Sequence, residues 1–108
     1  MEKLVMGKEV ELQAVFDSRA SFYKKAITRT DQTEYGTYHF LFSYGTFIIE
    51  LKLLSNGELI INAMTDDPSH LTQTTLRHLN EFMLQHGMSS KPKKDWLKVQ
   101  AAQMNYSI

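Results

Sequence analysis

The stretch from residue 38 to residue 62 constrains the fold of this chain more than any other segment. Aromatic residues alternate with other residues over 38–44, and apolar residues alternate again over 47–53. A period of two is typical of a half-buried strand, because successive side chains point to opposite sides of the backbone. The pattern therefore predicts three neighbouring strands, at residues 38–44, 46–54 and 58–62.

Two short segments predict the turns that join these strands. Gly45 follows Tyr44 between the first two, and glycine reaches the positive φ that tight hairpins need. The dipeptide Asn56-Gly57 follows Ser55 and is flanked by apolar residues on both sides, which makes it the strongest hairpin signal in the chain. Both of its residues suit a type I′ turn.

The residues before position 38 predict two more strands. Apolar and polar residues alternate over 8–16, although this segment also contains good helix formers, and a second alternating run covers 21–29. Residues 17–20 predict a turn or a single helical turn between them, because Asp and Ser side chains bond nearby backbone groups. Residues 30–34 are polar and predict a loop.

The C-terminal third predicts a main helix. Residues 66–68 (Asp-Asp-Pro) interrupt the sheet region, since proline pushes the residue before it away from helical geometry. Apolar residues then recur at helical spacing over 72–86. Thr72 or Ser69 can serve as the N-cap, and Gly87 stands where a left-handed C-cap belongs.

A short second helix is predicted after a linker. His86 falls in the last turn of the main helix, where an imidazolium would complement the helix dipole. Residues 88–94 predict the linker, and Asp95 can cap a helix over 95–104. Residues 105–108 are predicted to be loose.

Composition bounds the class of protein. The 108 residues fit one domain that buries roughly two-thirds of its unfolded surface. Its 12 basic and 12 acidic residues give a formal net charge of zero. The net charge therefore does not indicate binding to nucleic acid or to a membrane surface. No cysteine is present, which excludes disulfides, thiolate metal sites and cysteine nucleophiles. The N-terminus lacks a signal-peptide core, so we expect a cytoplasmic protein.

The sequence offers no catalytic or metal-binding constellation. The histidines His39, His70, His78 and His86 have no metal-ligand spacing, so no metal or other cofactor is predicted. The nucleophile-elbow, Walker A and dinucleotide-binding glycine motifs are all missing. The adjacent carboxylates at 66 and 67 are better explained as a solvated turn than as an acid/base pair. We therefore expect a protein that is not an enzyme.

Three groups of residues can be interpreted as binding elements or as ordinary structure. Arg77 and His78, near the positive end of the main helix, could bind an anion. Alternatively, the threonines before them cap the helix and Arg77 is a solvated helix residue. Aromatic residues crowd the central strands and could stack bases, although core packing is the simpler interpretation. A basic run beside a tryptophan could contact nucleic acid, or could be a linker with the indole packed on the core. That run consists of Lys91, Lys93, Lys94 and Trp96.

Three sequence blocks carry a resemblance to known proteins. They are residues 17–26 (DSRASFYKKA), 42–46 (FSYGT) and 72–82 (TQTTLRHLNEF). In this order they are similar to a group of small uncharacterised proteins of bacteria, their phages and other mobile elements. The chain departs from that group's pattern at Lys24, where a small residue is usual, and at Gly45, where Asn or Asp is common. The resemblance implies a phage, plasmid or prophage setting and no particular reaction.

The polar blocks permit two interpretations. In the first they are structural: Asp17 accepts hydrogen bonds from free amides at the start of the main helix, and Arg19 donates to loop carbonyls. In the second they form a binding surface. The residues of that surface are Arg19, Tyr23, Lys25, Arg77 and His78.

These inferences combine into one set of predictions. The fold is α+β: a mostly antiparallel sheet of about five strands with the main helix packed on one face and a possible short C-terminal helix. Residues 1–87 form the core domain, and residues 88–108 are a linker and short helix that pack on it or trail it. The leading function is a non-enzymatic module that binds a protein partner. The alternatives are an inhibitor of a host defence nuclease, an accessory protein that binds nucleic acid, and a homodimer paired through an edge strand.

Overall fold

The computed structural model describes residues 7–18 and 21–106, and side chains up to residue 103. Five antiparallel strands form one sheet in the order β1-β2-β3-β4-β5, so each strand pairs with its neighbours in sequence. The helices comprise a 3-10 turn η1, a helix α1 and a C-terminal helix α2. This confirms the predicted α+β fold. The bounds are β1 Val10–Glu11, β2 Ala26–Thr33, β3 Gly36–Ser43, β4 Thr46–Leu53, β5 Leu59–Met64, η1 Pro68–His70, α1 Gln73–Gln85 and α2 Lys93–Tyr106.

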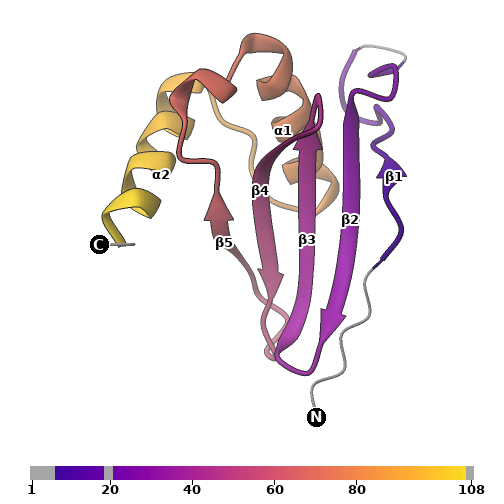
Figure 1. Ribbon diagram of the computed structural model, residues 1–108, viewed down its shortest axis with the longest axis vertical. Helices are drawn as coiled ribbons and strands as arrows, with labels where there is room; N and C mark the ends of the chain where they lie inside the picture. Colours follow the sequence, from indigo (N-terminus) through magenta and orange to yellow (C-terminus); the bar gives the residue numbers. More distant parts are fainter. Residues whose placement is uncertain (1–6, 19–20, 107–108) are drawn as a thin grey trace.

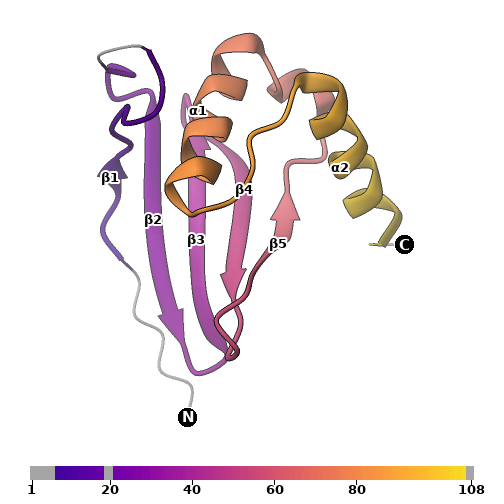
Figure 2. The ribbon, with the colours of Figure 1, turned by 180° about the vertical axis from the view of Figure 1, so that it is seen from behind.

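The two faces of the sheet are covered differently. Helix α1 crosses β3 and β4, behind them in Figure 1 and in front of them in Figure 2, while α2 lies beside β5 in both views. Of the described elements, no helix covers the opposite face, which is turned toward the viewer in Figure 1. We call the covered side the helix face and the other side the open face.

The N-terminal strands differ from the prediction. Within residues 8–16 the strand is limited to Val10–Glu11, beside which the Leu12 amide donates to the carbonyl of Ala26. The segment predicted as a strand from residue 21 becomes one at Ala26. Before that point Tyr23 and Lys24 have φ values of 53° and 63°, which an extended strand does not allow. The predicted loop at 30–34 is also wrong, because β2 continues to Thr33. Polar residues suit this end of β2, since strand pairing satisfies its backbone whatever the side chains are.

The two hairpin turns that the sequence predicts follow different geometries. Tyr44 and Gly45 both have positive φ, 52° and 77°, as a type I′ turn requires. Gly57 has a φ of 89° whereas Asn56 is not in the left-handed region, so the type I′ prediction there is wrong. The amide of Gly57 donates to the carbonyl of Leu54, which makes a three-residue loop with a left-handed glycine at its end.

A bulge in β4 changes the direction of one aromatic side chain. Leu41 pairs with Ile49, but the next residue of β3, Phe42, pairs with Phe47, so Ile48 is the extra residue. As a result Phe47 lies on the open face while Ile48 and Ile49 are both buried. The uniform alternation over 47–53 in the sequence hides this change.

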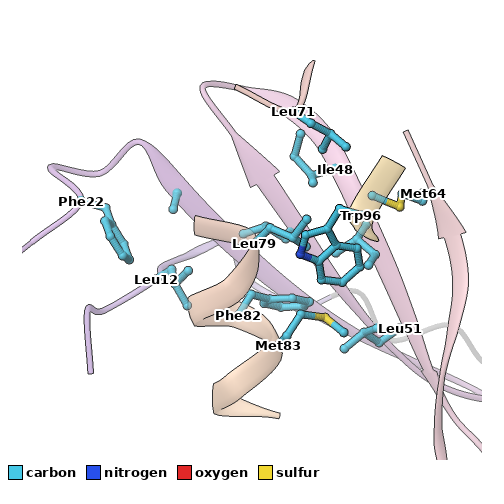
Figure 3. Close-up of a cluster of buried hydrophobic side chains, with 13 residues drawn as sticks. Leu12, Phe22, Ile48, Leu51, Met64, Leu71, Leu79, Phe82, Met83 and Trp96 are labelled. Carbon is cyan, nitrogen blue, oxygen red and sulfur yellow. The ribbon is translucent and has the colours of Figure 1, made fainter. Parts of the chain in front are cut away.

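The core lies between the helix face and the helices. Figure 3 shows side chains of α1 and the indole of α2 meeting those of the strands. Burying each large apolar side chain contributes about 1.5–3 kcal/mol, so this cluster is the main source of stability. Its members are Leu12, Phe22, Ala26, Leu41, Ile48, Ile49, Leu51, Met64, Leu71, Leu79, Phe82, Met83 and Trp96.

Both ends of α1 are capped as the sequence predicts. The hydroxyl of Thr72 accepts a hydrogen bond from the Thr75 amide, so Thr72 is the N-cap. At the other end Gly87 has a φ of 74°, and the amide of Met88 returns to the carbonyl of Met83. Helix α2 begins two residues before Asp95, which therefore lies in its first turn and does not cap it.

Candidate functional site

A small pocket lies where the three sequence blocks of the resemblance meet. Its volume is about 160 Å³, which is room for one amino-acid side chain and not for a large ligand. The first block supplies one wall, Tyr44 of the β3–β4 turn a second, and the start of α1 a third. The lining residues are Ser21, Phe22, Tyr23, Lys25, Tyr44, Thr74, Arg77 and His78.

The loop before β2 holds an unusual backbone conformation. Tyr23 and Lys24 are consecutive left-handed residues, a conformation that costs roughly 1–2 kcal/mol per residue for L-amino acids. Three hydrogen bonds maintain it: the Tyr23 amide donates to Ser21 Oγ at 2.9 Å, the Lys24 amide to Glu11 Oε2 at 3.0 Å, and the Lys25 amide to the Phe22 carbonyl at 2.9 Å. The loop thereby presents the Tyr23 ring to solvent, 74% exposed.

The β3–β4 turn is tied to this loop. The Tyr44 amide donates to the carbonyl of Lys25 at 2.8 Å, and Lys25 Nζ lies 6.0 Å from the centre of the Tyr44 ring. Tyr44 also has positive φ, so two of the aromatic walls of the pocket, Tyr23 and Tyr44, stand on strained backbone. Strain of this kind persists where the surrounding structure fixes it, and it often marks a functional site.

A buried polar network lies under the pocket. Ser43 Oγ shares a hydrogen bond of 2.8 Å with Thr75 Oγ1 and another of 2.8 Å with His78 Nδ1. The rings of Phe22 and Tyr44 contact His78, with centroid separations of 4.7 and 5.9 Å. The network thus joins β3 to α1 and fixes the orientation of the imidazole.

The Ser43–His78 pair has the composition of a nucleophile and base but not their accessibility. Ser43 is 2% exposed and His78 is 1% exposed. A nucleophile must reach a substrate carbonyl, and this hydroxyl is enclosed between strand and helix. The geometry suits a structural role for the pair.

Arg77 joins the first block to α1. Its Nη2 atom donates to Asp17 Oδ1 at 2.6 Å and to Ser18 Oγ at 3.3 Å. Its Nε is buried and has no hydrogen-bond acceptor among the described residues. The interpretation of Arg77 as a solvated helix residue is therefore wrong. Its guanidinium is paired with Asp17, and the residue also lines the pocket.

The blocks meet as the structural interpretation requires, but the donors and acceptors differ. Glu81, in the middle of α1, accepts from the amides of Phe16 and Asp17 at 2.8 and 2.7 Å. Gln85 donates to Glu81 and to the carbonyl of Gln13, both at 2.6 Å. Helix side chains thus bind loop amides, whereas the prediction had Asp17 accept from helix amides.

Four of the five predicted binding residues line the pocket. They are Tyr23, Lys25, Arg77 and His78, although His78 contributes through a buried ring. Arg19 lies outside the described residues. Sequence reasoning missed Tyr44 as a wall of this site, and the signal that could have found it was the bulky residue at a type I′ turn position where Asn is preferred.

The weaker nucleic-acid group does not present a stacking platform. Trp96 is fully buried, and its Nε1 donates to Asn80 Oδ1 at 2.8 Å. Lys91 Nζ lies 5.3 Å from the centre of the indole, while Lys93 and Lys94 are exposed in the first turn of α2. The indole is therefore packed on the core, as the simpler interpretation has it.

A pair of histidines, His39 and His86, lies at the other end of α1. The rings of His39 and His86 are 4.5 Å apart, and His86 also contacts Phe82. Burial, and then the charge of His39, lower the pKa of His86 to about 4, and burial lowers the pKa of His39. The prediction of an imidazolium at the helix C-terminus is wrong, because His86 is neutral at pH 7.

The described residues contain neither a metal-binding cluster nor a membrane-spanning helix. In residues 7–18 and 21–106 no group of three His, Asp or Glu side chains could hold a metal ion. Over the same ranges, each helix is too short or too polar to cross a bilayer.

The comparisons with known proteins identify a family. Residues 10–98 match the model described as a family of unknown function (DUF8033). The chain belongs to the DUF8033 family. No curated protein and no solved structure matches it. The matched DUF8033 segment includes all three blocks around the pocket and ends within α2.

Proposed function

We propose that this DUF8033 protein is a non-enzymatic module that binds a protein partner at the pocket between the first block, the β3–β4 turn and α1. The convergence of three segments, far apart in sequence, on one small pocket carries this proposal. Two of its walls, Tyr23 and Tyr44, are exposed aromatic rings, 74% and 57% accessible. Exposed tyrosines on a fixed backbone are typical binding anchors, since they bury a large area at low conformational cost.

The charges of the lining favour an acidic side chain of the partner. Lys25 and Arg77 are the charged residues of the lining, which contains no carboxylate. Asp17 already holds one end of Arg77, so Lys25 is the more available cation. An aspartate or glutamate inserted between the tyrosines would pair with Lys25, and the positive charge of Arg77 in the same lining would favour it further.

A pair of matched variants tests the proposal. The pocket variant combines Tyr23→Ala with Lys25→Glu, and the control combines Tyr35→Ala with Lys94→Glu, which removes an equally exposed tyrosine and lysine elsewhere. Tagged proteins are used to capture partners from a bacterial lysate, and each partner's affinity is then measured by calorimetry. We expect the pocket variant to weaken binding about 30-fold or more at an unchanged melting temperature, and the control to bind like the wild type.

Two outcomes contradict the proposal. One is a partner that binds both variants equally, because the pocket is then not its docking site. The other is a set of captured proteins that bind with no saturation in calorimetry. If the captured partner is a nuclease, phage plaquing with the wild-type gene and with the pocket variant tests the inhibitor hypothesis directly.

A further inference from the structure

The open face of the sheet carries four aromatic rings that no described element covers. The ring centroids of Phe40 and Phe42, both in β3, are 6.4 Å apart. The ring of Phe47, in β4, packs edge-on against that of Phe42 with a centroid separation of 6.3 Å. Tyr38 is the fourth aromatic residue of this face and lies on β3, two positions before Phe40. All four rings remain half-buried, partly under the side chains of Arg29 and Lys52. The expectation that these aromatic residues fill the core is therefore wrong for this sheet.

Strand register arranges this face in three cross-strand rows. In each row a residue of β2, a residue of β3 and a residue of β4 stand side by side. The rows are Ile27–Phe42–Phe47, Arg29–Phe40–Glu50 and Asp31–Tyr38–Lys52.

The charges of these rows are opposite on the two sides of β3. Arg29 on β2 faces Glu50 on β4 across Phe40, and Asp31 on β2 faces Lys52 on β4 across Tyr38. A two-fold axis that runs along β3, above the face, exchanges the β2 side of one copy with the β4 side of the other. It places Arg29 over Glu50, Asp31 over Lys52 and Ile27 over Phe47 of a second copy, twice each.

We propose that the open face binds a second copy of this chain, as a face-to-face sheet pair with its two-fold axis along β3. Aligned sheets pack about 10 Å apart with their strands within about 30° of each other, which keeps each row opposite its reversed copy. Within one copy Arg29 contacts Asp31 at 3.1 Å, and Glu50 accepts from Asn62. Glu50 is partly exposed on the face and can reach Arg29 of the partner. Asp31 is buried and also accepts from the Gly7 amide at 3.0 Å, so its charge acts on Lys52 of the partner from below the surface.

A second copy fits this face better than single-stranded nucleic acid does. Aromatic strands can stack bases, but a polyanion would meet the Glu50 carboxylate and, below the surface, the negative charge of Asp31 in the same rows as the cations. Pairing through the β1 edge has little backbone to use, because β1 contains only Val10–Glu11. From the spacing of strands and residues, the open face has an area of about 400 Å² per copy. An interface of this size is small, so we expect dimerisation to depend on protein concentration.

Charge exchange at one row tests this arrangement. Glu50→Arg gives copies with two cations in the central row, and Arg29→Glu gives copies with two carboxylates. We expect each variant alone to be monomeric at concentrations where the wild type dimerises, and an equimolar mixture to form the heterodimer, since every cross-copy pair is then opposite in charge. Sedimentation velocity over a concentration series measures all three samples, and circular dichroism confirms that each variant is folded.

A second variant keeps the test decisive if Arg29→Glu does not fold. Lys52→Glu places a carboxylate over Asp31 of the other copy, so we expect weaker dimerisation, whereas the control Tyr35→Ala lies outside the three rows and should dimerise like the wild type. A wild-type chain that is monomeric at about 1 mM overturns the proposal. So does a dimer that both charge variants leave intact. A salt-sensitive complex with an oligonucleotide that Phe40→Ala abolishes would assign the face to nucleic acid.

Discussion

The two faces of this sheet carry similarly apolar residues, but these are fully buried on the helix face and partly exposed on the open face. On the helix face, Leu41, Ile49 and Leu51 are fully buried under α1 and α2. On the open face, Phe40 and Phe42 are as apolar but remain half-exposed, with a guanidinium over them. Apolar alternation therefore predicts that a strand is present, and it does not reveal which side the rest of the chain will cover.

The largest expected effect separates the two faces by stability. Phe82→Ala in α1 removes a fully buried ring and should lower the free energy of unfolding by about 3–5 kcal/mol. Phe40→Ala removes the same side chain from the open face and should cost about 1–2 kcal/mol in the monomer, because the site is already partly solvated. Urea denaturation at low protein concentration measures both. Equal losses would mean that the open face is part of the core.

The next effect concerns the polar support of the pocket. Ser43→Ala removes the hydroxyl that joins Thr75 to His78 and should cost about 1–3 kcal/mol, since buried polar atoms lose a partner. Thr46→Ala, at the partly exposed start of β4, is the control and should change stability by less than about 0.5 kcal/mol. If both substitutions cost the same, the network is not the link between β3 and α1.

A smaller effect depends on pH and again belongs to the helix face. The pKa of His86 is about 4 in the folded chain and near 6.5 when unfolded, so the unfolded state binds more protons between these values. Stability from this group is present above pH 6.5 and is lost as the pH falls toward 4. We expect the melting temperature to fall by several degrees between pH 7 and pH 4.5, and His86→Asn to reduce that fall. A variant with the full wild-type pH dependence would place the effect elsewhere.

The smallest effect concerns strain beside the pocket. Lys24 has a φ of 63° and an exposed side chain, so Lys24→Gly relieves the left-handed cost without removing a packed group. We expect a gain of about 0.5–1 kcal/mol in unfolding free energy by thermal melts. Thr37→Gly, within β3, is the control and should destabilise. A loss at Lys24 would show that the loop conformation carries no strain.

The central hairpins, the main helix and its caps could be predicted because they depend on local patterns. Thr72, Gly87 and Gly45 each act through neighbours only a few residues away. The ends of β2 could not be predicted, because its polar half is held by pairing with β3 and its start is delayed by the left-handed turn at Tyr23. Long-range partners decide such boundaries, and a single sequence does not display them.

The candidate site was only partly predictable for a related reason. Tyr23, Lys25 and Arg77 stand out as residues with binding chemistry in unusual blocks, and the structure brings them to one pocket. The role of Glu81 in holding the loop amides could not be foreseen, since it is a charged residue fully buried on a helix. Its two acceptor bonds, made some 65 positions away in the chain, are what allow that burial.

The extra residue at Ile48 has a consequence for changes in chain length. With Ile48 removed, Phe47 and Ile49 would become ordinary neighbours that still point to opposite sides, so a deletion there costs one core side chain and preserves the parity of β4. A deletion at Glu50 would instead exchange inside for outside along half of the strand. Shortened natural or engineered versions of this chain should therefore lose a residue at position 48 far more readily than two positions later.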